Sequence, residues 1–189
     1  VSAVPAYIYP FPSTFIQDHF SLTLPLLSPL YWLLNPIFGS YSLLILQWIF
    51  IVIGAWATFK FVARKSTQAV FPYLACLFYF VLFGRYSAYL NDVNLAIIGA
   101  SLVPLLLYYF DSNKFITTSV LFLLLLLNRE DYALWLFFIA VFLLILNRKD
   151  LKKRRVAMYM AIAACVYFVL VMWVFIPALE DEHRKYNLF

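Results

Sequence analysis

Long apolar runs alternate with short polar breaks along most of this chain. The runs are 14 to 23 residues long, and the breaks between them carry Lys, Arg, Asp or Asn. A helix of about 20 apolar residues crosses the hydrocarbon core of a bilayer. The pattern therefore predicts an all-α, polytopic integral membrane helix bundle with about six transmembrane helices in this fragment. The expected spans are about 41–63, 69–84, 93–110, 115–128, 132–147 and 156–176.

The break at Asn128-Arg129-Glu130-Asp131 separates the fourth span from the fifth. One helix from Phe115 to Asn147 would hold 33 residues and be about 50 Å long. The bilayer core is only about 30 Å thick, and a charge at its centre costs about 2.5–3.5 kcal/mol. The sequence therefore predicts two short spans that meet at a turn recessed in a protein-lined, wet cavity. An ordinary polar loop is the alternative.

The first 40 residues do not form a span of this kind. Residues 1–19 contain three prolines and predict an outer loop. Residues 20–34 are apolar but short and contain Pro25 and Pro29, which favours one interfacial, juxtamembrane helix. Turns are expected at Asn35-Pro36 and at Gly39-Ser40. At the other end of the chain, residues 177–189 are charged and begin another outer segment.

Composition supports a membrane protein and excludes two other classes. Hydrophobic residues make up 66% of the chain and charged residues 12%, with a mean hydropathy of +0.89, so a soluble domain is excluded. The net charge of +5 does not indicate nucleic-acid binding, because Lys and Arg stand at the ends of the apolar runs. The chain starts at Val1, and we expect 1–189 to be a single transmembrane domain fragment of a longer protein.

The distribution of charge predicts the orientation. Ten Lys and Arg residues lie at one set of span ends and four at the other, so the first set should face the cytoplasm. Seven of the nine carboxylates then fall on the outer side. Acids contribute little to topology, so this gathering requires either solvation of outer loops or a shared site. The outer acids are Asp18, Asp92, Glu130, Asp131, Glu180, Asp181 and Glu182.

Two outer polar groups precede the third span. Asp18 beside His19 could act as a general base or meet a cation or phosphate, or could be a solvated loop pair. Asp92 and Asn94, two residues apart with Asn91 before them, form a weak pattern for Mg²⁺ or Mn²⁺ against a phosphate. Asn91 or Asp92 could instead cap a helix.

Two arginines on the same side could contact phosphate. Arg85 lies just before the third span, where a snorkelling interfacial position is the alternative. Arg129 stands beside Glu130 and Asp131, which could serve as a base or as metal ligands, and an internal ion pair is the expected use of that arginine. The chain lacks a Gly-rich phosphate loop, a Cys/His zinc pattern and a Gly-x-Ser-x-Gly motif.

Three segments resemble the prokaryotic membrane protein family called domain of unknown function 2079. They are Asp18-His19-Phe20-Ser21, then Pro29-Leu30-Tyr31-Trp32-Leu33-Leu34 with Leu46-Gln47, and the acidic pair Glu130-Asp131 after a Leu-rich span. Members usually carry Lys before that pair, where this chain has Arg129. The resemblance covers most of the chain and implies a multi-pass protein of the prokaryotic cytoplasmic membrane.

That family is similar in layout to the GT-C glycosyltransferases, which use sugars linked to polyprenyl phosphate. The likeness implies that Asp18 matches the acid of the first outer loop, and that Asp92 with Asn94 matches the second-loop motif. Metal-dependent members carry Asp where this chain has Asn94. Together with the local chemistry above, the roles expected are catalytic for Asp18, Glu130 and Asp131, phosphate binding for His19, Arg85, Asn91 and Arg129, and metal binding for Asp92 and Asn94.

Two functions remain open from the sequence. The first is a membrane glycosyltransferase that takes its sugar from a polyprenyl-phosphate donor at the extracytoplasmic face, with either Mg or Mn or no cofactor. The second is a non-catalytic multi-pass protein, either a lipid or ion transporter or an assembly partner. A transporter predicts internal repeats and charges on both faces, whereas the acids here are one-sided. The partners expected are membrane lipids and the lipid-linked donor, without nucleic acid.

Overall fold

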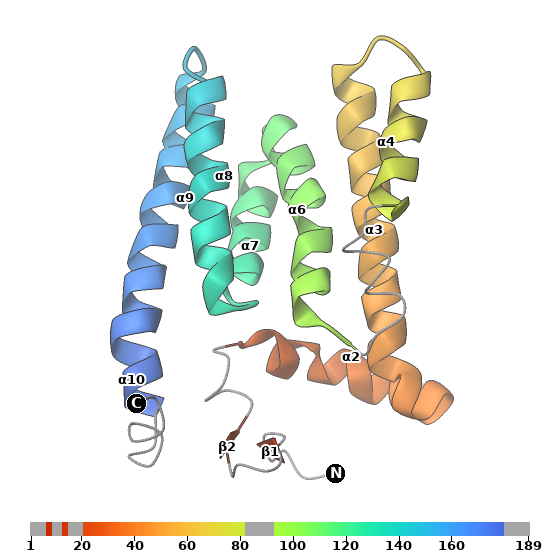
Figure 1. Ribbon diagram of the computed structural model, residues 1–189. Helices are drawn as coiled ribbons and strands as arrows, with labels where there is room; N and C mark the ends of the chain where they lie inside the picture. The colour runs from red at the N-terminus through yellow and green to blue at the C-terminus, as the bar shows by residue number, and fades with distance from the viewer. Residues whose placement is uncertain (1–6, 9–12, 15–20, 82–92, 180–189) are drawn as a thin grey trace. The chain divides into compact units, whose positions relative to one another are not determined.

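The computed structural model describes residues 7–8, 13–14, 21–81 and 93–179 of the chain (Figure 1). Its contacts divide the chain into two compact units, one of residues 23–128 and one that combines residues 1–22 with 129–189. Apart from one short hairpin, the described residues are helical. The expectation of a single domain stays a prediction.

The unit of residues 23–128 contains five helices and one short 3₁₀ turn in its described part. They are α2 (Thr23–Phe38), the turn η1 (Gly39–Tyr41), α3 (Ser42–Lys65), α4 (Val70–Val81), α6 (Leu95–Asp111) and α7 (Phe115–Leu126). Helix α3 packs against α2, α4 and α6, and α6 also packs against α7. Helix α2 runs crosswise to α3 (Figure 1), as expected for a helix along the membrane surface. The break at Gly39, whose φ is +55°, separates the two.

The predicted turn at Asn35-Pro36 is wrong, because α2 continues to Phe38 with Pro29 and Pro36 inside it. Proline lacks the N–H that would bond to the carbonyl four residues earlier. For Pro29 that carbonyl belongs to Pro25, and the Ser28 hydroxyl donates to it at 2.7 Å instead. A side chain thus supplies a donor that the backbone cannot, and the interfacial helix extends four residues beyond the expected 20–34.

The core of this unit forms where α3, α4 and α6 meet. Ile51, Ala55 and Tyr79 are buried together. Gly54 lies in the same place, and a Cβ added to it would stand 2.1 Å from the Tyr79 hydroxyl and 2.5 Å from the Ser101 carbonyl oxygen. Only a residue without a side chain permits this close approach of helices, as is common where helices pack in membranes.

One end of this unit is fixed by an ion-pair group. The Asp111 carboxylate at the end of α6 receives Arg64 at 3.4 Å and also Lys65, both from the end of α3. The Arg64 guanidinium also lies over the Tyr108 ring, 5.8 Å from its centroid. These contacts hold the ends of α3 and α6 side by side.

The other unit contains a short hairpin and a pair of long helices. Strands β1 (Tyr7–Ile8) and β2 (Ser13–Thr14) pair antiparallel, in the segment where the sequence predicted only an extended loop. Helix α8 (Glu130–Leu146) packs against α9 (Leu151–Leu170). Small buried side chains line this contact, which lets the two backbones approach closely. They are Ala133 and Ala140 on α8 and Ala157, Ala161 and Ala164 on α9.

Three expected boundaries change in this unit. Glu130 and Asp131 lie in the first turn of α8 rather than in the turn before it. Helix α9 starts at Leu151 instead of about 156, because the Asp150 carboxylate accepts from the N–H groups of Lys152 and Lys153 and caps it. Pro177 does not end the sixth helix. A π-helical turn η2 (Val171–Phe175) and the short helix α10 (Ile176–Leu179) continue it.

Two helical stretches are long and apolar enough to cross a bilayer by length and composition. They are Pro25–Lys65, which joins α2, η1 and α3, and Leu151–Phe175, which joins α9 and η2. Helix α7, of 12 residues, is about 18 Å long and shorter than the bilayer core. Six spans stay a prediction, and the described residues form helices that include two span-length stretches.

Candidate functional site

Polar side chains gather at the N-terminal end of α6 in the unit of residues 23–128. Four of them, Thr23, Gln47, Asn94 and Asn128, form what we call the α6-start network. Gln47 is fully buried, and Thr23 and Asn128 are 8% and 2% exposed. Buried polar groups are rare in membrane proteins and generally have a structural or functional role.

Each side chain of this network bonds to a backbone group of another element or of the α6 start. The Asn94 N–H donates to Gln47 Oε1 at 2.7 Å, and Asn94 Oδ1 accepts from the Ala96 N–H at 2.9 Å. The Asn128 amide donates to the Leu95 carbonyl at 3.1 Å. The Thr23 hydroxyl donates to the Leu127 carbonyl at 3.3 Å. The network thus ties α2, α3 and the residues after α7 to the start of α6.

Sequence reasoning missed Gln47 and Thr23 as site residues and used Asn128 only as part of a polar turn. A signal for Gln47 was present, since it is the only polar residue in the otherwise apolar run 43–53. A lone amide at that depth needs a partner. The partner could not be read from the sequence, because it is a backbone N–H 47 residues away.

Replacing Gln47 by Met should destabilise the protein by about 1–3 kcal/mol, because the Asn94 N–H loses its acceptor while side-chain volume is nearly kept. Thermal unfolding in detergent would measure the loss. The exposed Gln68 gives a matched control, since Gln68→Met removes the same group from a loop. Equal unfolding temperatures for the two variants would show that the network does not hold α6.

A charged group lies where α8 begins, in the other unit. Arg129 Nε and Asp131 Oδ1 are 3.4 Å apart, with side chains 25% and 46% exposed. The internal ion pair expected for Arg129 is thereby confirmed. Glu130 and Asp131 occupy the first helical turn, where the helix dipole favours negative charge. Arg129, Glu130 and Asp131 are partly buried, and the recessed, wet cavity stays a prediction.

Tyr167 lies near the end of α9, the helix that packs against α8. The negative charge of Glu130 acts on its hydroxyl. The antiparallel pairing of α8 and α9 brings the start of one helix to the end of the other. The sequence carried no signal for this residue, because Tyr is common throughout the chain.

The remaining candidates divide into one described residue and five outside the described part. Asn94 is described and caps α6, with its side-chain oxygen bonded to Ala96. That capping position was expected of Asn91 or Asp92. Within residues 21–81 and 93–179, no group of three or more His, Cys, Asp or Glu could hold a metal ion. The candidates that lie outside the described residues are Asp18, His19, Arg85, Asn91 and Asp92.

Comparison with known proteins identifies the family. The family model described as "Predicted membrane protein (DUF2079)" matches residues 9–188, nearly the whole chain. No curated protein and no solved structure matches the chain. The helical structure, its two span-length stretches and this match agree with one another. The chain therefore belongs to the DUF2079 family of predicted membrane proteins.

Proposed function

We propose that this protein is a GT-C-type glycosyltransferase of the prokaryotic cytoplasmic membrane. It takes a sugar from a polyprenyl-phosphate carrier at the extracytoplasmic face and transfers it to a hydroxyl acceptor. The observation that carries the proposal is the charged group at the start of α8, where Arg129, Glu130 and Asp131 are partly buried together. Ionisable groups held at such a position in a membrane protein indicate a functional site.

The described geometry supports two separate tasks. Asp131 pairs with Arg129 Nε, which helps to orient the guanidinium, and the other N–H donors of Arg129 can bond to a phosphate. Glu130 lies in the same helical turn and supplies a second carboxylate. A carboxylate of this kind can accept a proton or hold a sugar hydroxyl.

In the chemical step, Asp18 is assigned the role of general base. The acceptor hydroxyl gives its proton to the Asp18 carboxylate while its oxygen forms a bond to the sugar's anomeric carbon. The bond from that carbon to the phosphate oxygen breaks, and the electron pair leaves with the polyprenyl phosphate. Arg129 is assigned as a donor of positive charge to the leaving phosphate, and His19 as a secondary donor.

A Mg or Mn ion would be held by Asp92 and Asn94. Asn94 is the member of this pair that the structure describes, and its side-chain oxygen accepts the Ala96 N–H at the start of α6. That geometry is the geometry of a helix cap, so the Asn94 oxygen already has a backbone partner.

The full-length protein in nanodiscs tests this proposal. Purified wild-type protein should consume a radiolabelled sugar on polyprenyl phosphate and release the carrier, and should leave the matching sugar nucleotide untouched. A membrane without the protein is the control. Absence of turnover with a panel of lipid-linked sugars, together with flux of lipid or ions across the bilayer, would replace the transferase by a transporter.

A further inference from the structure

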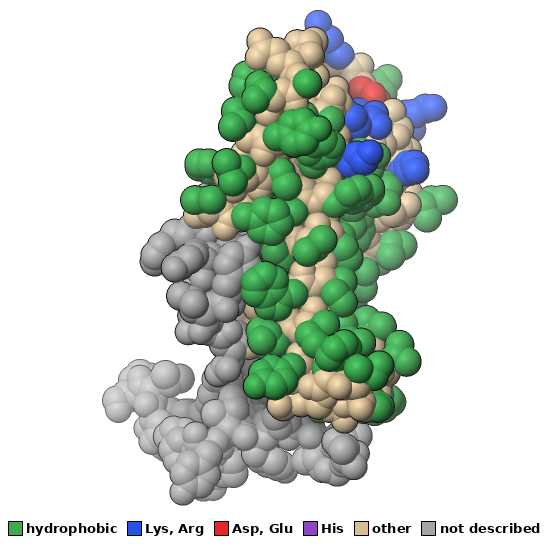
Figure 2. Space-filling model, turned by 90° about the vertical axis from the view of Figure 1, so that its right-hand side faces the viewer, with side chains coloured by type: hydrophobic (Ala, Val, Ile, Leu, Met, Phe, Trp, Pro, Cys, Tyr) green, Lys and Arg blue, Asp and Glu red, His purple; other side chains and the backbone are tan. Residues whose placement is uncertain are grey.

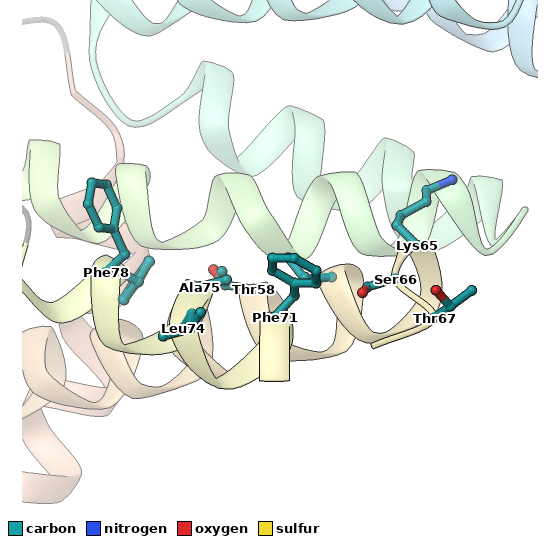
Figure 3. Close-up of a pocket in the computed structure, with 10 residues that line it drawn as sticks. Thr58, Lys65, Ser66, Thr67, Phe71, Leu74, Ala75 and Phe78 are labelled. Carbon is teal, nitrogen blue, oxygen red and sulfur yellow. The ribbon is translucent and has the colours of Figure 1, made fainter. Parts of the chain in front are cut away.

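A groove lies between α3 and α4 and has no part in the function proposed above. Its volume is about 820 Å³, within the range of small-molecule sites. Figure 3 shows its two ends: Lys65, Ser66 and Thr67 lie at one, and Phe78 at the other. The groove is lined by Thr58, Val62, Lys65, Ser66, Thr67, Phe71, Leu74, Ala75, Phe78 and Tyr79.

One face of each helix forms the walls. On α4 the lining positions are 71, 74, 75, 78 and 79, and on α3 they are 58, 62 and 65. Both sets follow the three- and four-residue spacing that places side chains on one side of a helix. From Phe71 to Phe78 the helix advances about 10 Å, which keeps the groove within the roughly 15 Å depth of one leaflet.

The apolar wall ends at positive charge. Phe71, Leu74 and Phe78 are 48%, 50% and 69% exposed, so the wall is open to whatever surrounds the helices. On the face of Figure 2, hydrophobic side chains cover most of the described surface and Lys and Arg lie toward one end. We call the Lys65 end of the groove its mouth. There the Asp111 carboxylate pairs with both Arg64 and Lys65, so one positive charge is in excess.

The hydroxyls at the mouth have different uses. The Ser66 hydroxyl bonds to Gln68 within the loop, donating to its carbonyl and accepting from its N–H at 3.1 Å each. It therefore fixes the shape of the mouth. Thr67 is exposed at the same place. Lys65, which is 55% exposed, has N–H donors beyond the one directed at Asp111.

We propose that this groove binds one anionic phospholipid from the leaflet at the Lys65 end, which is cytoplasmic in the predicted orientation. An acyl chain lies along Phe71, Leu74 and Phe78, and the phosphate meets Lys65 and Thr67. The excess charge at the mouth favours a headgroup with net negative charge over a zwitterionic one. The apolar wall favours an acyl chain over a water-soluble ligand, because this protein belongs to a membrane protein family.

Native mass spectrometry of the full-length protein tests the site, with phosphatidylglycerol and phosphatidylcholine of identical acyl chains as probes. Wild-type protein should retain one phosphatidylglycerol at least about fivefold better than phosphatidylcholine, the effect of about one charge near a lipid surface. Lys65→Gln should remove that preference. Ala75→Phe should fill the groove and abolish retention of both lipids, because Ala75 is a lining residue.

Matched variants separate the groove from the general surface. Lys60→Gln removes a charge from an exposed α3 position outside the lining, and Ala63→Phe adds a ring at another. Both should bind like wild type, with thermal unfolding confirming that every variant is folded. Equal retention of the two lipids by wild type, or unchanged retention in Ala75→Phe, overturns the proposal. So does crosslinking that places another chain segment or a second copy in the groove.

Discussion

Asp18→Asn in the full-length protein is expected to lower sugar transfer by about 100- to 10,000-fold, the usual contribution of a general base. The amide keeps the size of the side chain and loses its ability to accept the acceptor's proton. Expression and unfolding temperature should stay the same, because the sequence predicts a loop here and surface substitutions usually change stability by less than about 0.5 kcal/mol. Initial rates with a lipid-linked sugar, normalised to purified protein, measure the effect.

Asp150→Asn is the matched control for this experiment. Asp150 caps α9 by accepting from Lys152 and Lys153, and Asn caps a helix about as well as Asp. This variant makes the same chemical change outside the proposed site and should keep wild-type activity. Full activity of Asp18→Asn would remove that residue from the mechanism, and equal loss in both variants would point to a general effect of charge.

Gly54→Leu is expected to destabilise the fold by about 3 kcal/mol or more, the upper range for overpacked cores. Its Cβ would stand 2.5 Å from the Ser101 carbonyl oxygen, which belongs to the α6 backbone and cannot rotate away. Helix propensity opposes this loss by only about 1 kcal/mol, so the steric term decides. Thermal unfolding in detergent should show a fall of at least about 6 °C.

Two further variants test whether steric overlap causes the loss of stability. Ala63→Leu enlarges an exposed residue of the same helix and should change stability by less than about 0.5 kcal/mol. Tyr79→Phe removes the hydroxyl oxygen that would lie 2.1 Å from the new Cβ, so it should restore part of the stability lost in Gly54→Ala. Wild-type stability of Gly54→Leu would mean that α3 and α6 pack less closely than described.

The candidate site shows where sequence patterns stop being informative. The acidic pair after the Leu-rich run was identifiable, because charge beside such a run stands out, and its ion pair with Arg129 is local. Gln47 was visible as a lone amide, whereas its bond to Asn94 was not. The effect of the Glu130 charge on Tyr167 was equally hidden. Both of these pairs join residues more than 35 positions apart, and hydrophobic periodicity carries no information on such pairs.

The sequence by itself determined the class of this protein: a helical membrane protein with polar breaks near residues 39, 66, 112 and 128 and charges at the helix ends. It could do so because the bilayer imposes length and apolarity on each segment separately. Only the tertiary structure decided that α2 continues through Pro29 and Pro36, that Gly54 is a contact point and that Gln47 holds α6. Those features depend on which side chains and backbone groups are in contact. Similar residues occur at many positions along the chain, and only the packing of the helices determines which of them meet.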